Sequence, residues 1–145
     1  MGRLVSIDAA SGEERRRSPL DTVYIRTVTF INGRILAIAG ENRGNGAVRL
    51  IEINPRSLEM AKQGDDDMHP GSLIWVNGSD LYAITANLAD GTLYLGRFAS
   101  DLTLQANSEI NVHPNATVTI QQGRLLTQRR DGSILILNPG DLKEN

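Results

Sequence analysis

The sequence predicts an all-β fold, a propeller-like array of about three and a quarter four-stranded antiparallel meanders. One phrase returns along the chain, as NGRILAI at 32–38, NGSDLYAI at 77–84 and, in part, QGRLLTQ at 122–128. Short apolar segments rich in β-branched residues end at Asn-Gly, Asp-Gly or Asn-Pro pairs, and no segment has a convincing helical pattern. A constant period of about 45 residues indicates one supersecondary unit used several times, each copy packing on its neighbours.

The chain starts in the middle of such a unit. The segment LVSID at 4–8 aligns with LIEIN at 50–54, so residues 4–19 resemble the third strand, turn and fourth strand of the meander. The tight turn at Asn32-Gly33 suits a hairpin because both residues tolerate positive φ. The first full unit then has four predicted strands, at residues 23–31, 35–39, 48–53 and 58–63.

Two further units follow the same plan. In each unit the second and third strands are almost continuously apolar and the fourth is polar, as in Arg15-Arg16-Arg17 of the front unit. Radial packing requires this order, because the outermost strand of each sheet lies on the rim. The third unit has a missing or vestigial fourth strand. The predicted strands are 73–76, 81–86, 93–98 and 102–112 in the second unit, and 117–120, 125–129 and 134–137 in the third.

One domain accounts for residues 1–145, a length that suits a single core. Because the pattern begins and ends out of phase, we expect Met1-Gly2 to be an artificial start on a domain excised from a longer protein. Open sheet edges and exposed apolar faces need cover, so the expected partners are another protein, the remainder of the parent chain or a second copy of this chain. The predicted parts are the partial unit 4–19, unit one 22–66, unit two 67–112 and the incomplete unit three 113–145.

Composition excludes several classes of function. The 15 Lys and Arg residues nearly balance the 17 Asp and Glu residues, leaving a net charge of -2, so the basic surface typical of nucleic-acid binding is missing. Without cysteine there are no disulfides, thiolate metal sites or cysteine nucleophile. No segment has the apolar core of a signal peptide or the length of a membrane span, so we expect no membrane insertion by this domain. The sequence does not indicate a cellular compartment, because a targeting signal can lie elsewhere in the parent protein.

The segment LVSIDAASGE at 4–13 resembles a signature of quinoprotein-like propellers. In that family the signature leads into a docking tryptophan, and this chain has arginine at that place. The other copies, NPRSLE, ASDLTL and NPGDLK, keep the turn without the signature. The resemblance therefore implies propeller architecture alone and no quinone cofactor.

A narrower resemblance covers more of the chain and rests on three strings, TVYIRTVTFINGRILAIAG, DDMHPGSLIWVNGSDLYAI and YLGRFASDLTLQ. They are similar to the C-terminal domain of a large spirochaetal antigen family, whose members are exported or membrane-associated. This resemblance implies a parent with a signal segment and a long N-terminal region. It supplies no catalytic residues.

The two histidines stand in equivalent positions of consecutive units, each directly before a proline. Two imidazoles on one face, from His69 and His113, could bind a metal or move protons near neutral pH. The alternative is that His-Pro is a recurring turn between units, since proline restricts both itself and the preceding residue. We favour the turn, because neighbouring units hold the rings apart unless both point to the axis.

Three consecutive carboxylates, Asp65, Asp66 and Asp67, lie in the connection between units one and two. Carboxylate oxygens are calcium ligands, but a calcium loop alternates ligands with spacers and places a glycine inside its turn. This segment does neither, which favours a solvated acidic loop.

The glycine-rich stretch 40–46 superficially resembles a phosphate-binding loop. No lysine or helix follows it, so the amide array and dipole of such a loop are absent. Its length, compared with the tight turns at Asp90-Gly91 and Asp131-Gly132, makes it the best loop candidate for a binding role. Its candidate residues are Asn42, Arg43 and Asn45.

We therefore predict a non-catalytic binding or structural module, a protein-interaction domain of a larger exported bacterial protein. No Gly-x-Ser-x-Gly elbow or recognisable serine, histidine and carboxylate spacing is present, and we expect no catalytic residue, cofactor or metal. The alternative is a metal- or small-ligand-binding domain, even an enzyme, centred on His69, His113 and the loop Asp65 to Asp67.

Overall fold

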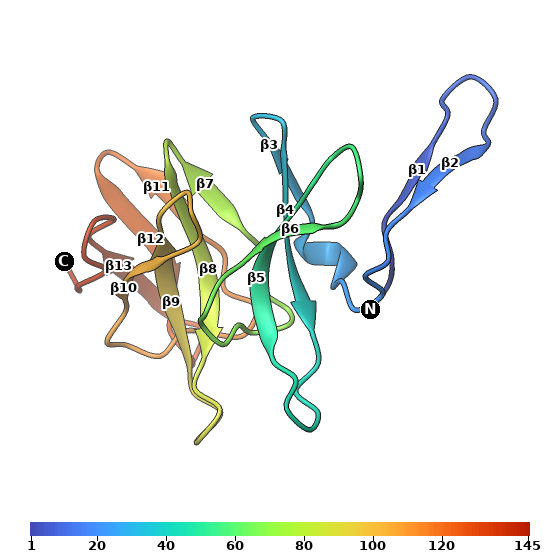
Figure 1. Ribbon diagram of the computed structural model, residues 1–145. Helices are drawn as coiled ribbons and strands as arrows, with labels where there is room; N and C mark the ends of the chain where they lie inside the picture. The colour runs from blue at the N-terminus through green and yellow to red at the C-terminus, as the bar shows by residue number, and fades with distance from the viewer.

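The computed structural model describes residues 1–145 and consists of four antiparallel sheets (Figure 1). The helical content is one short 3-10 turn, η1 (Ile25–Thr27). No helix of the structure has the length and apolar character that crossing a bilayer requires. The predicted all-β class with antiparallel pairing is therefore confirmed.

Strands that follow one another in the sequence also lie side by side in each sheet. The hairpin sheet has two strands, the β3–β6 and β7–β10 sheets have four each, and the β11–β13 sheet has three. The strands are β1 (Val5–Ile7), β2 (Glu14–Arg17), β3 (Thr29–Ile31), β4 (Arg34–Gly40), β5 (Val48–Ile53), β6 (Met60–Gln63), β7 (Trp75–Asn77), β8 (Asp80–Ala86), β9 (Leu93–Phe98), β10 (Leu104–Asn107), β11 (Thr119–Gln121), β12 (Arg124–Gln128) and β13 (Ile134–Leu137).

The predicted third strands, at 48–53, 93–98 and 134–137, have the observed bounds. The strand predicted at 23–31 is wrong over its first half, because Val23 makes only isolated bridges and η1 follows it before β3 begins. The strand predicted at 102–112 is also too long, since β10 ends at Asn107. In both places the apolar residues belong to the connection between two sheets, where they pack without extending a ladder.

Three apolar clusters form the core, and two of them lie between consecutive sheets, which stack face to face from β3–β6 to β11–β13 in Figure 1. The cluster between the β3–β6 and β7–β10 sheets includes Leu36 and Leu50 from one side and Leu81 and Phe98 from the other. A second cluster joins the β7–β10 and β11–β13 sheets. The third lies on the opposite face of the β3–β6 sheet, where Leu4 and Leu20 from the chain around the hairpin sheet pack against it.

The turn after each third strand carries a residue in the left-handed region. Leu58, Leu102 and Leu142 have φ of 58°, 75° and 58°, and their exposed fractions are 5%, 1% and 1%. Positive φ strains a leucine, and burial of its side chain offsets that strain. Gly12 takes this position in the β1–β2 turn, with φ of 75° and nothing within 4 Å of the place where a Cβ would lie.

The connections between sheets use the same bonds at three junctions. Val23 and Met68 each bridge a residue of the second strand of the following sheet, and Val112 bridges Arg129, directly after the second strand β12. Each also donates its backbone N–H to a carbonyl earlier in the chain, at Gly2 before β1, at Val48 of β5 and at Leu93 of β9, over 3.0, 3.0 and 2.9 Å. The second and third connections therefore hydrogen-bond both sheets that they join.

Candidate functional site

A groove of about 480 Å³ lies between β1 of the hairpin sheet and the β3–β6 sheet. We call it the β1 groove. Most of its lining is apolar, and it opens beside the hairpin that projects from the body of the molecule in Figure 1. Its walls are Leu4, Val5 and Ser6 at β1, Phe30 to Ile35 of the β3–β4 hairpin, and Pro55 and Leu58 of the β5–β6 turn.

Phe30 is the most exposed large apolar side chain of the structure, at 73%. Val76 and Ile120 occupy the same place in the next two sheets, because all three pair with the second residue of the following strand. Both of these are partly buried against the apolar clusters. Phe30 differs because the hairpin sheet beside it has only two strands, and its side chain stays uncovered.

One edge of β1 has no neighbouring strand. The Leu4 carbonyl accepts a bond from Ser18 N–H, and Asp8 N–H donates to the Glu13 carbonyl, so both residues direct these groups toward the β2 side. Backbone groups alternate along an antiparallel strand, which directs those of Val5 and Ile7 to the free edge. Unpaired backbone donors and acceptors of this kind are a template for another strand.

The two His-Pro segments form turns at the sheet junctions. His69 N–H donates to the Ile84 carbonyl at 2.9 Å, and Ser72 N–H donates back to the His69 carbonyl at 3.0 Å. His113 makes the corresponding bond to Gln128 at 3.1 Å. Burial lowers the pKa of His69, and a hydrogen bond with the Pro114 backbone partly opposes that shift.

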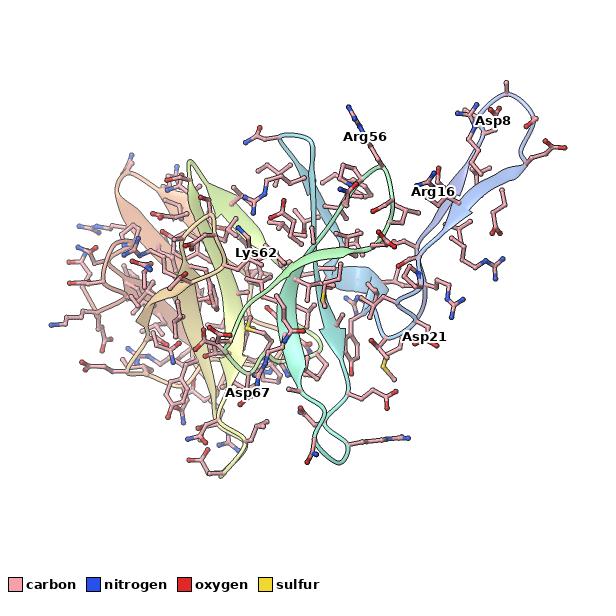
Figure 2. All side chains as sticks on the ribbon, in the orientation of Figure 1. Asp8, Arg16, Asp21, Arg56, Lys62 and Asp67 are labelled. Carbon is pink, nitrogen blue, oxygen red and sulfur yellow. The ribbon has the colours of Figure 1, made fainter.

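The Asp65 to Asp67 segment lies in the connection between the β3–β6 and β7–β10 sheets, where Figure 2 labels Asp67. Asp67 forms an ion pair with Arg49. Asp65 and Asp66 line two small polar grooves of about 320 and 280 Å³. Desolvation by burial raises the pKa of Asp66, and the neighbouring Asp65 charge acts in the same direction.

The structure does not gather these groups into a metal centre, because no three His, Cys, Asp or Glu side chains lie close enough to hold an ion. The polar groove beside Asp65 to Asp67 includes neither histidine. The alternative prediction of a shared site therefore has no geometry that favours it.

The loop from Gly40 to Gly46 joins β4 to β5 and is closed by a bond from Gly46 N–H to the Arg43 carbonyl at 2.9 Å. Asn42 Oδ1 accepts from Val48 N–H at 3.2 Å, and the Arg43 side chain is 85% exposed. A Cβ on Gly40 would lie 2.0 Å from the Ala47 carbonyl oxygen, so glycine is required there. Asn42 thus holds the loop, and Arg43 and Asn45 are exposed on it.

Sequence reasoning did not identify the β1 groove or Phe30. Phe30 reads as one more apolar residue of a strand, and its exposure depends on which strands the neighbouring sheet lacks. A signal was nevertheless present, because the predicted front unit has its third and fourth strands and lacks its first two.

Comparison with known proteins identifies the family. The Borrelia P83/100 protein family matches residues 1–118, which is most of the chain. The chain belongs to this family. The match supports the predicted resemblance to a spirochaetal antigen family. No curated protein matches the chain.

Among solved structures, the crystal structure of the computationally designed Ika8 protein is similar to the chain, with a TM-score of 0.60 and 14% sequence identity. The alignment covers 99% of this chain and 42% of the designed protein. At this identity the likeness concerns the fold alone. The chain thus spans less than half the length of the structure that it resembles.

Proposed function

We propose that this member of the Borrelia P83/100 family is a non-catalytic protein-interaction module of a larger, exported bacterial protein. Its sheets are copies of one meander arranged about a common centre in the manner of a β-propeller. The recurring bonds at Val23, Met68 and Val112 support that arrangement, as do the apolar clusters between consecutive sheets.

The observation that carries the functional proposal is the uncovered apolar surface at the two ends of the stack. Phe30 is 73% exposed beside the β1 groove, and Ile134 of β13 is 69% exposed at the other end. Apolar surface rimmed by polar residues is typical of protein contact sites. No three His, Cys, Asp or Glu side chains lie close enough to hold a metal ion.

The test places a photo-crosslinking amino acid at Phe30 or Ile134 of the full-length protein in the bacterium. Lys62, exposed on the outer strand β6 and labelled in Figure 2, provides the control position. We expect discrete protein adducts from Phe30 or Ile134 and none of the same mass from Lys62. Absence of adducts at both apolar positions, or identical adducts at all three, would contradict an interaction role.

A further inference from the structure

We propose that the β1 groove receives a β-hairpin of a partner polypeptide, whose second strand adds to the free edge of β1. This inference rests on the proposed interaction function and names its site and the chemistry of the partner. The partner segment has the pattern of the first two strands of this chain's own sheets, with aliphatic residues at alternate positions of the second strand.

The template for this contact is present elsewhere in the molecule. In the β3–β6 sheet the second strand, β4, pairs with β5 through the register Ala37↔Ile51 and Ile35↔Ile53. The corresponding residues of β1 are Val5 and Ile7, because Val5, Ser6 and Ile7 align with Ile51 to Ile53. A strand in the position of β4 would therefore bond the backbone groups of Val5 and Ile7 that are unpaired here.

The side chains of β4 indicate what the incoming strand must carry. Leu36 and Ile38 project from β4 into the cluster with the β7–β10 sheet, and both have no exposed surface. A docked strand would direct its two corresponding side chains at the β3–β6 sheet, near Phe30 and Ile35. Burial of two aliphatic side chains and of Phe30 is the main stabilising contribution.

A polar contact marks the same position. Arg34, the first residue of β4, donates to the Ser100 carbonyl of the next sheet at 2.6 Å and also pairs with Glu52. Ser100 stands two residues after the end of β9, as Pro55 stands two residues after the end of β5. The Pro55 carbonyl in the wall of the β1 groove is thus an acceptor for an arginine of the partner hairpin.

Groove size agrees with a missing hairpin. The corresponding space between the next two sheets, bounded by Arg34 and Ser100, has a volume of about 320 Å³, against about 480 Å³ for the β1 groove. In that smaller space Ile31 and Arg34 of the β3–β4 hairpin supply one wall, facing Val76 and Leu81. The hairpin sheet has only β1 and β2, so no hairpin equivalent to β3–β4 forms this wall in the β1 groove.

The probe for this site is a labelled synthetic peptide with the sequence of residues 28–41, which contains the β3–β4 hairpin. A control peptide carries serine at the positions of Leu36 and Ile38. We expect saturable binding of the first peptide by fluorescence anisotropy and binding at least about tenfold weaker for the second. Hydrogen exchange should show new protection at the Val5 and Ile7 amides, which non-specific adhesion would not produce.

Two variants locate the binding. Phe30→Asp should weaken peptide binding by about tenfold or more, whereas Leu88→Asp, a change at an exposed apolar residue between β8 and β9, should leave it unaltered. Ile7→Pro removes a donor at the free edge only, a change that an edge strand tolerates, and should abolish the protection of Val5.

Equal binding by Phe30→Asp and Leu88→Asp would overturn the inference. So would a dimer, detected by sedimentation, that Phe30→Asp dissociates while the peptide fails to bind, because the occupant would then be a second copy of this chain. If the peptide fails but Ile134 still gives discrete adducts in the bacterium, the hairpin site is wrong and the interaction role stands.

Discussion

The two faces of the β3–β6 sheet carry similar apolar residues, but the neighbouring sheets bury them to different extents. Toward the β7–β10 sheet, Leu36 and Ile38 have no exposed surface, because four strands lie opposite them. Toward the two-stranded hairpin sheet, Ile35 and Ala37 are buried but Phe30 is 73% exposed. The comparison teaches that burial in stacked sheets depends on the number of strands in the neighbour as well as on the apolar character of the residue.

Alanine substitutions on the two faces should have the most unequal effects. Leu36→Ala removes a side chain from the closed cluster and should lower the free energy of unfolding by about 3 kcal/mol, from lost transfer energy and a residual cavity. Phe30→Ala removes an exposed ring and should change the free energy of unfolding by less than about 0.5 kcal/mol. Urea unfolding of both variants measures the difference.

A large loss of stability in Phe30→Ala would break this comparison. It would mean that the ring is covered in solution, for example by a second molecule, and the unfolding midpoint would then depend on protein concentration. A midpoint that is independent of concentration serves as the control.

The junctions on the two sides provide a finer comparison. At the open junction, between the hairpin sheet and the β3–β6 sheet, Thr27 Oγ1 accepts a hydrogen bond from Ile38 N–H at 2.8 Å. At the closed junction, between the β3–β6 and β7–β10 sheets, Ser72 Oγ accepts one from Ile84 N–H at 2.7 Å. Each hydroxyl satisfies a buried donor, so Thr27→Ala and Ser72→Ala should each lower the free energy of unfolding by about 1 to 2 kcal/mol. Thermal unfolding of the two variants checks this.

Ala116 takes the corresponding place at the third junction, where it offers no hydroxyl. Ala116→Ser should therefore raise stability by up to about 1 kcal/mol through a new bond to the Gln128 N–H. A Thr27→Ala variant far milder than Ser72→Ala would show that the open groove already admits water to its junction.

The smallest expected effect is the pH dependence of the free energy of unfolding. It concerns the closed junction only, because the open junction has Tyr24 in the place of His69. Burial lowers the pKa of His69 below its ordinary value of 6.5, so the unfolded chain takes up this proton at a higher pH than the folded chain. Above pH 6.5, His69 should therefore not affect the free energy of unfolding. As the pH drops below 6.5, the free energy of unfolding should fall.

Urea midpoints of the wild-type chain and of His69→Gln, measured between about pH 8 and about pH 5.5, isolate this contribution. The variant should lose part of the decline at acid pH. Parallel curves for the two proteins would mean that His69 is as accessible to protons in the folded chain as in the unfolded one.

Particular elements illustrate how far sequence reasoning reaches. β5, β9 and β13 have their predicted bounds because their apolar runs end at turn residues that stop a ladder. The strand predicted at 23–31 was too long, since Val23 and Ile25 look equally strand-like. Only the packing reveals that Val23 is buried between two sheets and that Ile25 lies in η1, 60% exposed.

The candidate site likewise has residues that the sequence indicated and residues that only the structure revealed. The sequence indicated His69, His113, Asp65 to Asp67 and the 40–46 loop by their chemistry, and their roles in binding stay predictions. Phe30 and the free edge of β1 were not named, because nothing in their local pattern distinguishes them from Val76 or β5. Their exposure arises from strands that another sheet lacks.

The sequence by itself determined the strand class, the order of the strands and the tight turns, because short apolar segments and the Asn-Gly or Asp-Gly pairs that end them act over a few residues. The tertiary structure decided which apolar residues are covered, which backbone edge is free and where the β1 groove lies. Those properties depend on contacts between sheets far apart in the chain: both faces of the β3–β6 sheet hold an apolar cluster, and Phe30 beside the β1 groove stays exposed.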